Sequence, residues 1–280
     1  MLATRILTAA VLIPAVLAAL FLLPPLAWGC VALAVIALAS IEWGRLVGLS
    51  APARNVFLAA VVVIGVALLN APSAQFARGW PPSIVLALCG LASLFWIVVA
   101  PAWVVRRWPT KRPVVMVAVG LIVLLAAWMA LVQMQARSPW LVLAAMAVVW
   151  IADSAAYFSG RAFGKHKLAP AVSPGKSWEG VYGAWVAVAI YGWLLARYAS
   201  DAGFRFDVSP VTVAIWIAFL VALASVSVVG DLFESLLKRH AEVKDSGTLL
   251  PGHGGVLDRI DALLAAMPIA AVAAEWCLER

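Results

Sequence analysis

The sequence predicts an all-α integral membrane protein, a polytopic bundle of about nine transmembrane helices. Only 12% of its 280 residues are charged and 65% are hydrophobic, whereas soluble domains contain about 25% charged residues. The mean hydropathy is +1.04, and apolar runs of the roughly 20 residues needed to cross a bilayer recur along the chain. These three observations exclude a soluble globular protein.

Nine apolar runs, bounded by Pro, Gly and charged residues, are the expected spans. Because lipid offers no hydrogen-bond partner to free backbone N–H and C=O groups, each run is expected to be helical. Their Leu, Ala and Val content, without alternation of polar and apolar residues, also favours helices. The expected spans are Ile6–Leu23, Leu26–Leu46, Asn55–Leu69, Ser83–Val99, Val114–Met134, Trp140–Phe158, Trp178–Ala196, Val211–Val229 and Ile260–Cys277.

The basic residues predict the orientation of the bundle. If successive helices alternate in direction, 15 of the 20 Lys and Arg residues lie at one end and 5 at the other. By the positive-inside rule, the N-terminus and the richer loops face the cytoplasm, as expected for a multi-pass protein of the inner membrane. The net charge of +7 is then explained by topology and anionic lipid, so we expect no nucleic-acid partner.

Two loops on the predicted cytoplasmic side, Ser159–Ser177 and Gly230–Arg259, are long and rich in charged residues and glycine. Functional residues are concentrated in such loops. We therefore expect N-terminal transmembrane helices in residues 1–135 and a catalytic transmembrane region in residues 136–280. No repeat or linker indicates a further, soluble domain.

Carboxylates stand at helical spacing at both ends of the Gly230–Arg259 loop. If the preceding helix continues inward, residues at i, i+3, i+4 and i+7 share one face. These residues are Asp231, Glu234, Ser235 and Lys238. Asp258 and Asp261 open the last helix, where the positive end of the helix dipole favours carboxylates. The two acidic helix ends are expected to converge.

The composition of this loop fits phosphoryl or nucleotidyl transfer. Carboxylate oxygens bind Mg²⁺, and Lys or Arg neutralise phosphate oxygens. The run Gly252-His253-Gly254-Gly255 allows backbone N–H groups to face an anion, with His253 as a further contact. The alternative is structural, with Asp258 capping the last helix and the glycines forming the turn before it.

Asp153 lies within an apolar run before the Ser159–Ser177 loop. A carboxylate there costs a few kcal/mol and is a candidate functional residue, although an interfacial Asp exposed to headgroups is the alternative. The basic residues that follow are Arg161, Lys165, Lys167 and Lys176. They can bind the phosphate of a nucleotide or of a lipid. A topogenic or lipid-binding patch explains the same charges.

The other isolated polar residues carry weaker signals. Glu42, beside Trp43, is expected to be interfacial. His166 and His240 are expected to be solvated surface residues, and no HExxH pair supports a zinc site.

The segment from Ser235 to Asp261 resembles the signature of the phosphatidate cytidylyltransferases, the CDP-diacylglycerol synthases. That signature reads S-x-hydrophobic-K-R-x4-K-D-x-small-x2-hydrophobic-P/G-x-H-G-G-hydrophobic-x-D-R-hydrophobic-D. The matching residues are Ser235, Leu237, Lys238, Arg239, Lys244, Asp245, Gly247, Leu250, Pro251, His253, Gly254, Gly255, Val256, Asp258, Arg259, Ile260 and Asp261. A second block, from Asp153 to Gly180, is similar to the same family. The resemblance covers about the C-terminal half of the chain.

The resemblance implies transfer of a cytidylyl group from CTP to phosphatidic acid, giving CDP-diacylglycerol and pyrophosphate. It implies Mg²⁺, allows a second cation, and implies a homodimer. The implied metal ligands are Asp231 and Asp258, supported by Asp261, Asp245 and Glu234. The implied catalytic or phosphate-contacting cations are Lys238, Arg239, Lys244 and Arg259. The implied substrate-binding residues are Asp153, Arg161, Ser173, Lys176, Ser177, Ser235, His253, Gly254 and Gly255.

Two alternatives remain. A CDP-alcohol phosphotransferase also has acidic metal ligands at membrane helices, but its D-x2-D-G-x2-A-R run is absent. A transporter or channel can also contain an intramembrane carboxylate such as Asp153, yet it does not ordinarily need two long polar loops on one face.

Overall fold

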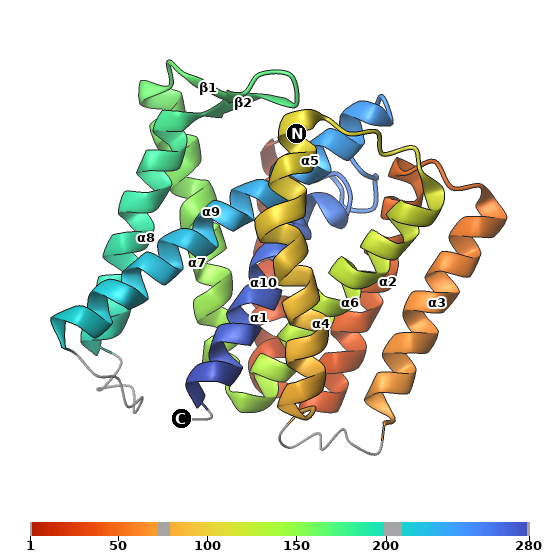
Figure 1. The fold of residues 1–280 in the computed structure, drawn as a ribbon, viewed down its shortest axis with the longest axis horizontal. Helices are drawn as coiled ribbons and strands as arrows, with labels where there is room; N and C mark the ends of the chain where they lie inside the picture. The colour runs from red at the N-terminus through yellow and green to blue at the C-terminus, as the bar shows by residue number, and fades with distance from the viewer. Residues whose placement is uncertain (1, 72–78, 199–208, 279–280) are drawn as a thin grey trace.

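The computed structural model describes residues 2–71, 79–198 and 209–278. The described part is a bundle of long helices with one small β-hairpin at its end (Figure 1). The first helices are α1 (Leu2–Leu22), α2 (Pro25–Leu46), α3 (Ala51–Leu69), α4 (Pro82–Leu94), the π-helical turn η1 (Phe95–Val99), α5 (Ala100–Arg106) and α6 (Pro113–Arg137). After them come α7 (Pro139–Phe163), β1 (Lys167–Ala169), β2 (Ser173–Ser177), α8 (Trp178–Tyr198), α9 (Pro210–His240) and α10 (Leu257–Leu278).

Proline marks the start of many of these helices. Pro25, Pro82, Pro113, Pro139 and Pro210 each stand in the first turn of their helix. The first N–H groups of a helix have no intrahelical acceptor, so a residue without an N–H is tolerated there, and its fixed φ already suits the helix.

The prediction of a polytopic α-helical membrane protein is confirmed. Within the described residues, eight helices are long and apolar enough to cross a bilayer, with α4, η1 and α5 forming one continuous span. They correspond to eight of the nine expected spans. The remaining expected span, Ile6–Leu23, lies in α1, which contains the shorter apolar helical stretch Ala10–Leu22.

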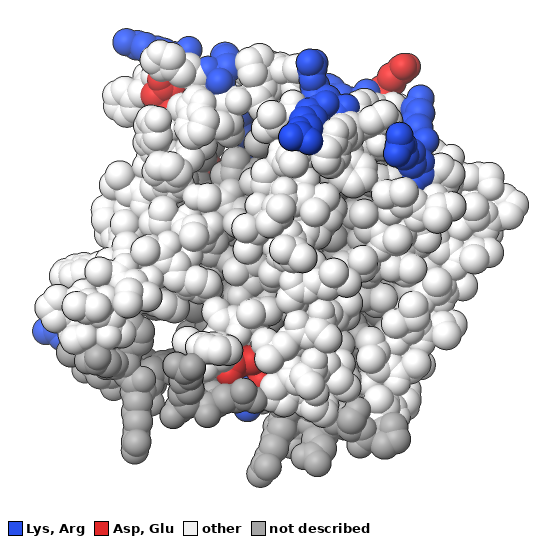
Figure 2. All heavy atoms as spheres, viewed as in Figure 1, with Lys and Arg blue, Asp and Glu red and all other residues white. Residues whose placement is uncertain are grey.

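The two ends of the chain lie at opposite ends of the bundle (Figure 1). The Thr8 hydroxyl donates to the Pro251 carbonyl oxygen at 3.1 Å, so α1 begins beside the loop that precedes α10. Helix α10 then runs to the other end. Opposite termini are what an odd number of crossings requires. On the face shown in Figure 2, the blue Lys and Arg side chains gather at the end with the hairpin, and the middle is almost uncharged.

Both charged loops are shorter than the sequence predicts. Helix α7 continues to Phe163, and residues 167–177 pair as an antiparallel hairpin with Lys167 opposite Ser177 and Ala169 opposite Ser173. Helix α9 continues to His240, which leaves only residues 241–256 outside helices. Hydropathy detects the part of a helix that lies in lipid, whereas backbone hydrogen bonding continues beyond it. The expected loop boundaries were therefore wrong at both places.

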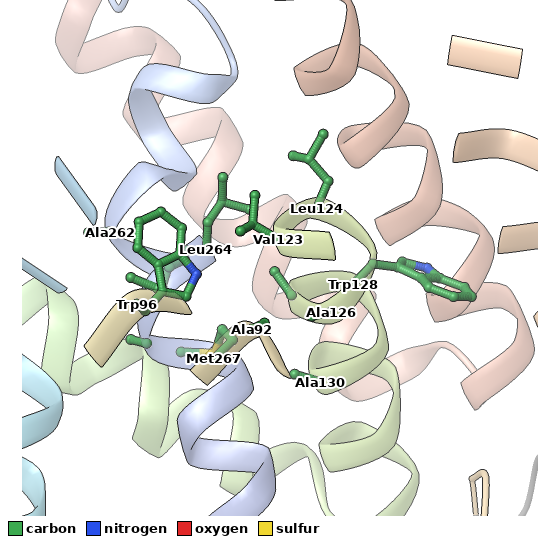
Figure 3. Close-up of a cluster of buried hydrophobic side chains, with 14 of the residues drawn as sticks. Ala92, Trp96, Val123, Leu124, Ala126, Trp128, Ala130, Ala262, Leu264 and Met267 are labelled. Carbon is green, nitrogen blue, oxygen red and sulfur yellow. The ribbon is translucent and has the colours of Figure 1, made fainter. Parts of the chain in front are cut away.

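Small residues allow the central helices to approach closely (Figure 3). Ala126 and Ala130 of α6 and Ala92 of α4 are fully buried beside Met267 of α10. Close backbone approach at small residues is the usual source of packing energy between membrane helices, because lipid gives no hydrophobic gain. Helix α10 is therefore fixed at the centre of the bundle.

An aromatic cluster fixes α9 against α2 and the α4–α5 span. The Phe233 ring is 1% exposed, and the rings of Phe95, Trp96 and Trp103 meet it edge-on at centroid distances of 5.5, 5.6 and 5.8 Å. Trp43 of α2 stacks on it at 6.2 Å. Such aromatic contacts add about 0.5–1.5 kcal/mol each beyond burial, so the rotation of α9 about its axis is well defined.

Candidate active site

The charged residues of α9, α10 and β2 meet at the hairpin end of the bundle. As the sequence predicts, Asp231, Glu234, Ser235 and Lys238 share one face of α9. The Ser235 hydroxyl donates to Asp231 Oδ1 at 3.3 Å, and Lys238 Nζ lies 2.5 Å from Glu234 Oε2, one turn away. The predicted convergence of the two acidic helix ends is confirmed, because Lys238 also contacts Asp258 of α10.

Lys238 lies between two buried carboxylates. Its Nζ is 2.7 Å from Asp258 Oδ1, and the side chains of Lys238 and Asp258 are 15% and 5% exposed. The Glu234 side chain is 4% exposed. Buried carboxylates are stable only when cations or hydrogen-bond donors compensate their lost hydration. Lys238 therefore supplies positive charge to both carboxylates at this end of α9.

The hairpin contributes a second ammonium group. Lys176 of β2 lies 2.6 Å from Asp231 Oδ2, and this pair is more exposed, at 24% and 31% of the two side chains. Arg239 Nε donates to the Val172 carbonyl oxygen at 3.1 Å. The hairpin is thus attached to α9 by one ion pair and one hydrogen bond to the backbone.

Two further carboxylates complete the charged group. Asp261, one turn along α10, interacts electrostatically with Asp231 and Lys176. Asp153 of α7, which is exposed, interacts with the same two residues. The carboxylates of this group are Asp153, Asp231, Glu234, Asp258 and Asp261. Like charges oppose one another's ionisation, so a further cation would favour the fully ionised group.

The carboxylates of this group are chemically suited to bind a divalent cation, because carboxylate oxygens are preferred ligands of Mg²⁺. Glu234 Oε1 is buried and accepts no hydrogen bond, and Asp231 is half-exposed. However, within the described ranges no three Asp, Glu, His or Cys side chains are near enough to bind one ion as they stand. The lysine ammonium groups lie at the carboxylates instead.

Asp258 has a structural role in addition to its contact with Lys238. Its Oδ2 accepts hydrogen bonds from the N–H groups of Ser246 and Gly255, both at 2.8 Å, and from the Ser246 hydroxyl at 2.9 Å. It therefore connects the 241–256 loop to α10. The structural alternative expected Asp258 to accept N–H groups from the first turn of the last helix. Its donors, Ser246 and Gly255, instead lie before that helix.

The backbone conformation of the loop explains two of its glycines. Gly252 and Gly254 have φ values of +75° and +81°, which only glycine adopts without strain. A tight turn results, in which Leu250 N–H donates to the Gly254 carbonyl oxygen at 2.9 Å and His253 N–H to that of Leu250 at 2.9 Å. His253 Nδ1 is buried without a partner.

The remaining predicted site residues are dispersed around this group. Lys244 and Asp245 are exposed in the loop, and Arg259 Nε donates to the His253 carbonyl oxygen at 2.9 Å. Arg161 Nη1 lies 3.1 Å from the Tyr157 hydroxyl on α7. Ser173 lies in β2, opposite Ala169.

Ser177, a predicted substrate contact, is buried at the junction of β2 and α8. Its hydroxyl is buried and accepts the Gly180 N–H at 3.3 Å at the start of α8. Gly160 and Gly164 pack against the same hydroxyl, since a Cβ on them would lie 3.1 and 2.9 Å from Ser177 Oγ. As it stands, Ser177 caps a helix and joins α7 to α8.

Comparison with known proteins decides the family. A model of the cytidylyltransferase family matches residues 3–277. The chain belongs to the cytidylyltransferase family. It is 41% identical to the phosphatidate cytidylyltransferase of Pseudomonas aeruginosa, over 99% of both chains, and 36% identical to that of Haemophilus influenzae, over 96% of both chains. The Thermotoga maritima protein of the same name is 45% identical over 43% of each chain.

The resemblance drawn from the motif is thus confirmed, and this cytidylyltransferase is an enzyme. The match also includes the N-terminal helices, for which the sequence contains no comparably specific motif. No observation on the described residues favours a transporter or channel.

One residue of the cytidylyltransferase was misjudged at the sequence level. Glu42 was expected to be interfacial, but it is 0% exposed and contacts the loop before α10. The sequence contains a feature that could have identified it, because Glu42 is the one acidic residue of the apolar run that forms α2. The argument applied to Asp153, that a carboxylate in such a run has a function, applies equally to Glu42.

Proposed function

We propose that the protein transfers the cytidylyl group of CTP to phosphatidic acid, forming CDP-diacylglycerol and releasing pyrophosphate. The observation that carries this proposal is the 41% identity, over 99% of both chains, to a protein named phosphatidate cytidylyltransferase. The cluster of lysines and carboxylates at one membrane end supports it, since the reaction joins two anionic phosphates. A lipid substrate can reach this end from the bilayer, and a nucleotide from the aqueous phase.

In this reaction an oxygen of the lipid phosphate attacks the α-phosphorus of CTP. A new P–O bond forms as the bond between the α-phosphorus and the bridging oxygen to the β-phosphate breaks, and pyrophosphate leaves. Transfer between two phosphates depends on positioning and charge neutralisation more than on a protein nucleophile. Lys176 and Lys238 would neutralise phosphate oxygens, at the cost of their contacts with Asp231 and Asp258.

The side chains Asp231, Asp261 and Glu234 would bind Mg²⁺, with Asp258 and Asp245 as further candidates. When bound, Mg²⁺ would neutralise charge on the triphosphate. The excess of carboxylates over lysines in the group supports this proposal. Lys244, Arg239, Arg259 and His253 are the proposed phosphate contacts of the loop.

The proposed location is the inner membrane, with the N-terminus, the hairpin and the 241–256 loop facing the cytoplasm. The gathering of Lys and Arg at this end supports this orientation (Figure 2). A homodimer, which the family resemblance implies, belongs to the same proposal and can be tested by measuring the mass of the detergent-solubilised particle.

The test is a transfer assay with purified protein in mixed micelles. CTP labelled on the α-phosphate is added with Mg²⁺ and phosphatidic acid, and the organic-phase label and the released pyrophosphate are measured. We expect equal amounts of both products and none after chelation of Mg²⁺. Diacylglycerol, which lacks the phosphate, is the control acceptor. Absence of transfer by folded wild-type protein would refute the proposed function.

A further inference from the structure

Glu42 is a buried carboxylate that reaches the active-site loop from the N-terminal half of the chain. Its Oε2 accepts the Leu257 N–H at 2.7 Å and the Ser246 hydroxyl at 2.9 Å, and its Oε1 accepts the Val256 N–H at 3.1 Å. Helix α10 begins at Leu257. The carboxylate of α2 therefore takes up N–H groups at the start of α10 that have no intrahelical acceptor.

Hydrogen bonds compensate the Glu42 carboxylate. Among the side chains that the structure describes, no Lys, Arg or His forms an ion pair with it. Three donated hydrogen bonds and the positive end of the α10 dipole stabilise the anion. Helix α2 thus supplies the negative charge that the start of α10 requires.

The loop is shaped around this carboxylate. A Cβ on Gly247 would lie 2.4 Å from Glu42 Oε1, and a Cβ on Gly255 would lie 2.5 Å from Oε2 and 2.2 Å from Ser246 Oγ. Both positions therefore require glycine because of neighbouring side chains, Glu42 at Gly247 and both Ser246 and Glu42 at Gly255, and not because of backbone torsion. A side chain at either position would displace the carboxylate from the N–H groups.

Ser246 connects Glu42 to the charged group. Its Oγ lies 2.9 Å from both Glu42 Oε2 and Asp258 Oδ2, so its single O–H can donate to either carboxylate. Asp258 in turn contacts Lys238. A continuous series of contacts leads from α2 through Ser246 and Asp258 to α9.

We propose that Glu42 is a positioning residue for cytidylyl transfer, which fixes Asp258 and the 246–257 segment in the geometry that the reaction needs. Glu42 acts through Ser246 and the start of α10, and it does not touch the reacting phosphates. The N-terminal helices are then part of the active site and not only a membrane scaffold. This inference rests on the proposed function for its kinetic test and has a second test that does not.

The informative substitution is Glu42→Gln. Both carboxylate oxygens of Glu42 accept an N–H, so the amide group of Gln must direct its own N–H₂ at one of these donors in either orientation. We expect a decrease in kcat of at least about 10-fold, the effect of a small displacement of a catalytic group. Glu42→Asp, which keeps the charge but is shorter, is expected to restore part of kcat.

A matched control is available at the opposite end of the bundle. Glu275 is 1% exposed, accepts from Gln133 Nε2 at 2.8 Å and pairs with Arg137 at 2.8 Å. Glu275→Gln also alters a buried, fully hydrogen-bonded carboxylate, so it controls for general loss of stability. We expect its kcat per folded molecule to equal that of the wild type.

The second test follows the loop itself. Lys244 is exposed in the segment that Glu42 anchors, so trypsin cleavage after Lys244 reports how often the loop departs from α10. We expect Glu42→Gln to accelerate this cleavage about 10-fold relative to wild type and to Glu275→Gln, as the opening equilibrium shifts. Mass spectrometry identifies the fragment that ends at Lys244.

The outcomes separate the two proposals. Inactive wild-type protein refutes the proposed function, and the cleavage assay then still decides whether Glu42 positions the loop. Active wild type together with unchanged kcat and KM in Glu42→Gln refutes the positioning role. A decrease in kcat that the Glu275→Gln control reproduces, or an unchanged cleavage rate at Lys244, also overturns it.

Discussion

Replacing Lys238 by Met should destabilise the protein far more than the same change at Lys176. Lys238 lies 2.5 and 2.7 Å from the Glu234 and Asp258 carboxylates, whose side chains are 4% and 5% exposed. Without the ammonium group, two buried carboxylates face each other with no cation between them. Removal of one partner from a buried ion pair costs about 3–5 kcal/mol.

Lys176→Met removes the same positive charge from a site that is more exposed to solvent than that of Lys238. The side chains of Lys176 and Asp231 are 24% and 31% exposed, so water can solvate Asp231 when the ammonium group is lost. Pairs of this exposure contribute about 1 kcal/mol or less. Both variants are expected to lose transfer activity, but only one should unfold readily.

The measurement is thermal unfolding of both variants in the same detergent, followed by circular dichroism. At roughly 2–4 °C per kcal/mol, the Lys238 variant should melt about 10 °C below wild type and the Lys176 variant only about 2 °C below it. Adding Glu234→Gln to Lys238→Met should recover part of the loss, because only one buried carboxylate is then left without its ammonium partner. Equal melting temperatures for the two single variants would contradict the assigned burial of Lys238.

Three further predictions concern function and topology. Asp231→Asn should lower kcat by about 100-fold or more while the melting temperature stays near that of wild type, because Asp231 is half-exposed; near-normal turnover at saturating Mg²⁺ would remove it from the metal ligands. A Cys at position 244, in a variant without the natural cysteines, should resist an impermeant thiol reagent added outside intact cells and react after permeabilisation. Rapid labelling from outside would reverse the proposed orientation. Incubation with Mg²⁺ and α-labelled CTP without phosphatidic acid should leave the protein unlabelled, because direct attack by the lipid phosphate needs no covalent intermediate; a label that later passes to phosphatidic acid would establish one.

Local periodicity predicted much of the fold and part of the site. Apolar runs identified the helices, because the bilayer requires a helix wherever such a run crosses it. The i, i+3, i+4 and i+7 spacing placed Asp231, Glu234, Ser235 and Lys238 on one face, since helical geometry alone determines that relation. The start of α10 was located from Asp258 and the glycines before it.

Contacts between distant segments were not predictable in this way. Glu42 and Ser246 are separated by 204 positions, and no periodicity relates them. The pairing of Lys176 with Asp231 depends on the hairpin, whose strands are too short and too polar for an alternation to be recognised. The hydrogen bond from the Gly180 N–H to the Ser177 hydroxyl was not predictable either, because a hydroxyl beside a lysine has the same sequence pattern whether it binds phosphate or caps a helix.

The aromatic cluster around Phe233 divides the active site into a rigid part and an adjustable part. Phe233 and Glu234 are consecutive residues of α9, so any rotation or sliding that moved the acidic face would also pull the ring away from Trp43, Trp96 and Trp103. Helices α9 and α10 therefore form the rigid part of the active site. The hairpin is joined to this rigid part by the Lys176 ion pair, the Arg239 hydrogen bond and the buried Val172 side chain. We therefore expect the rate of substrate binding to depend on these contacts of the hairpin more than on the helix core.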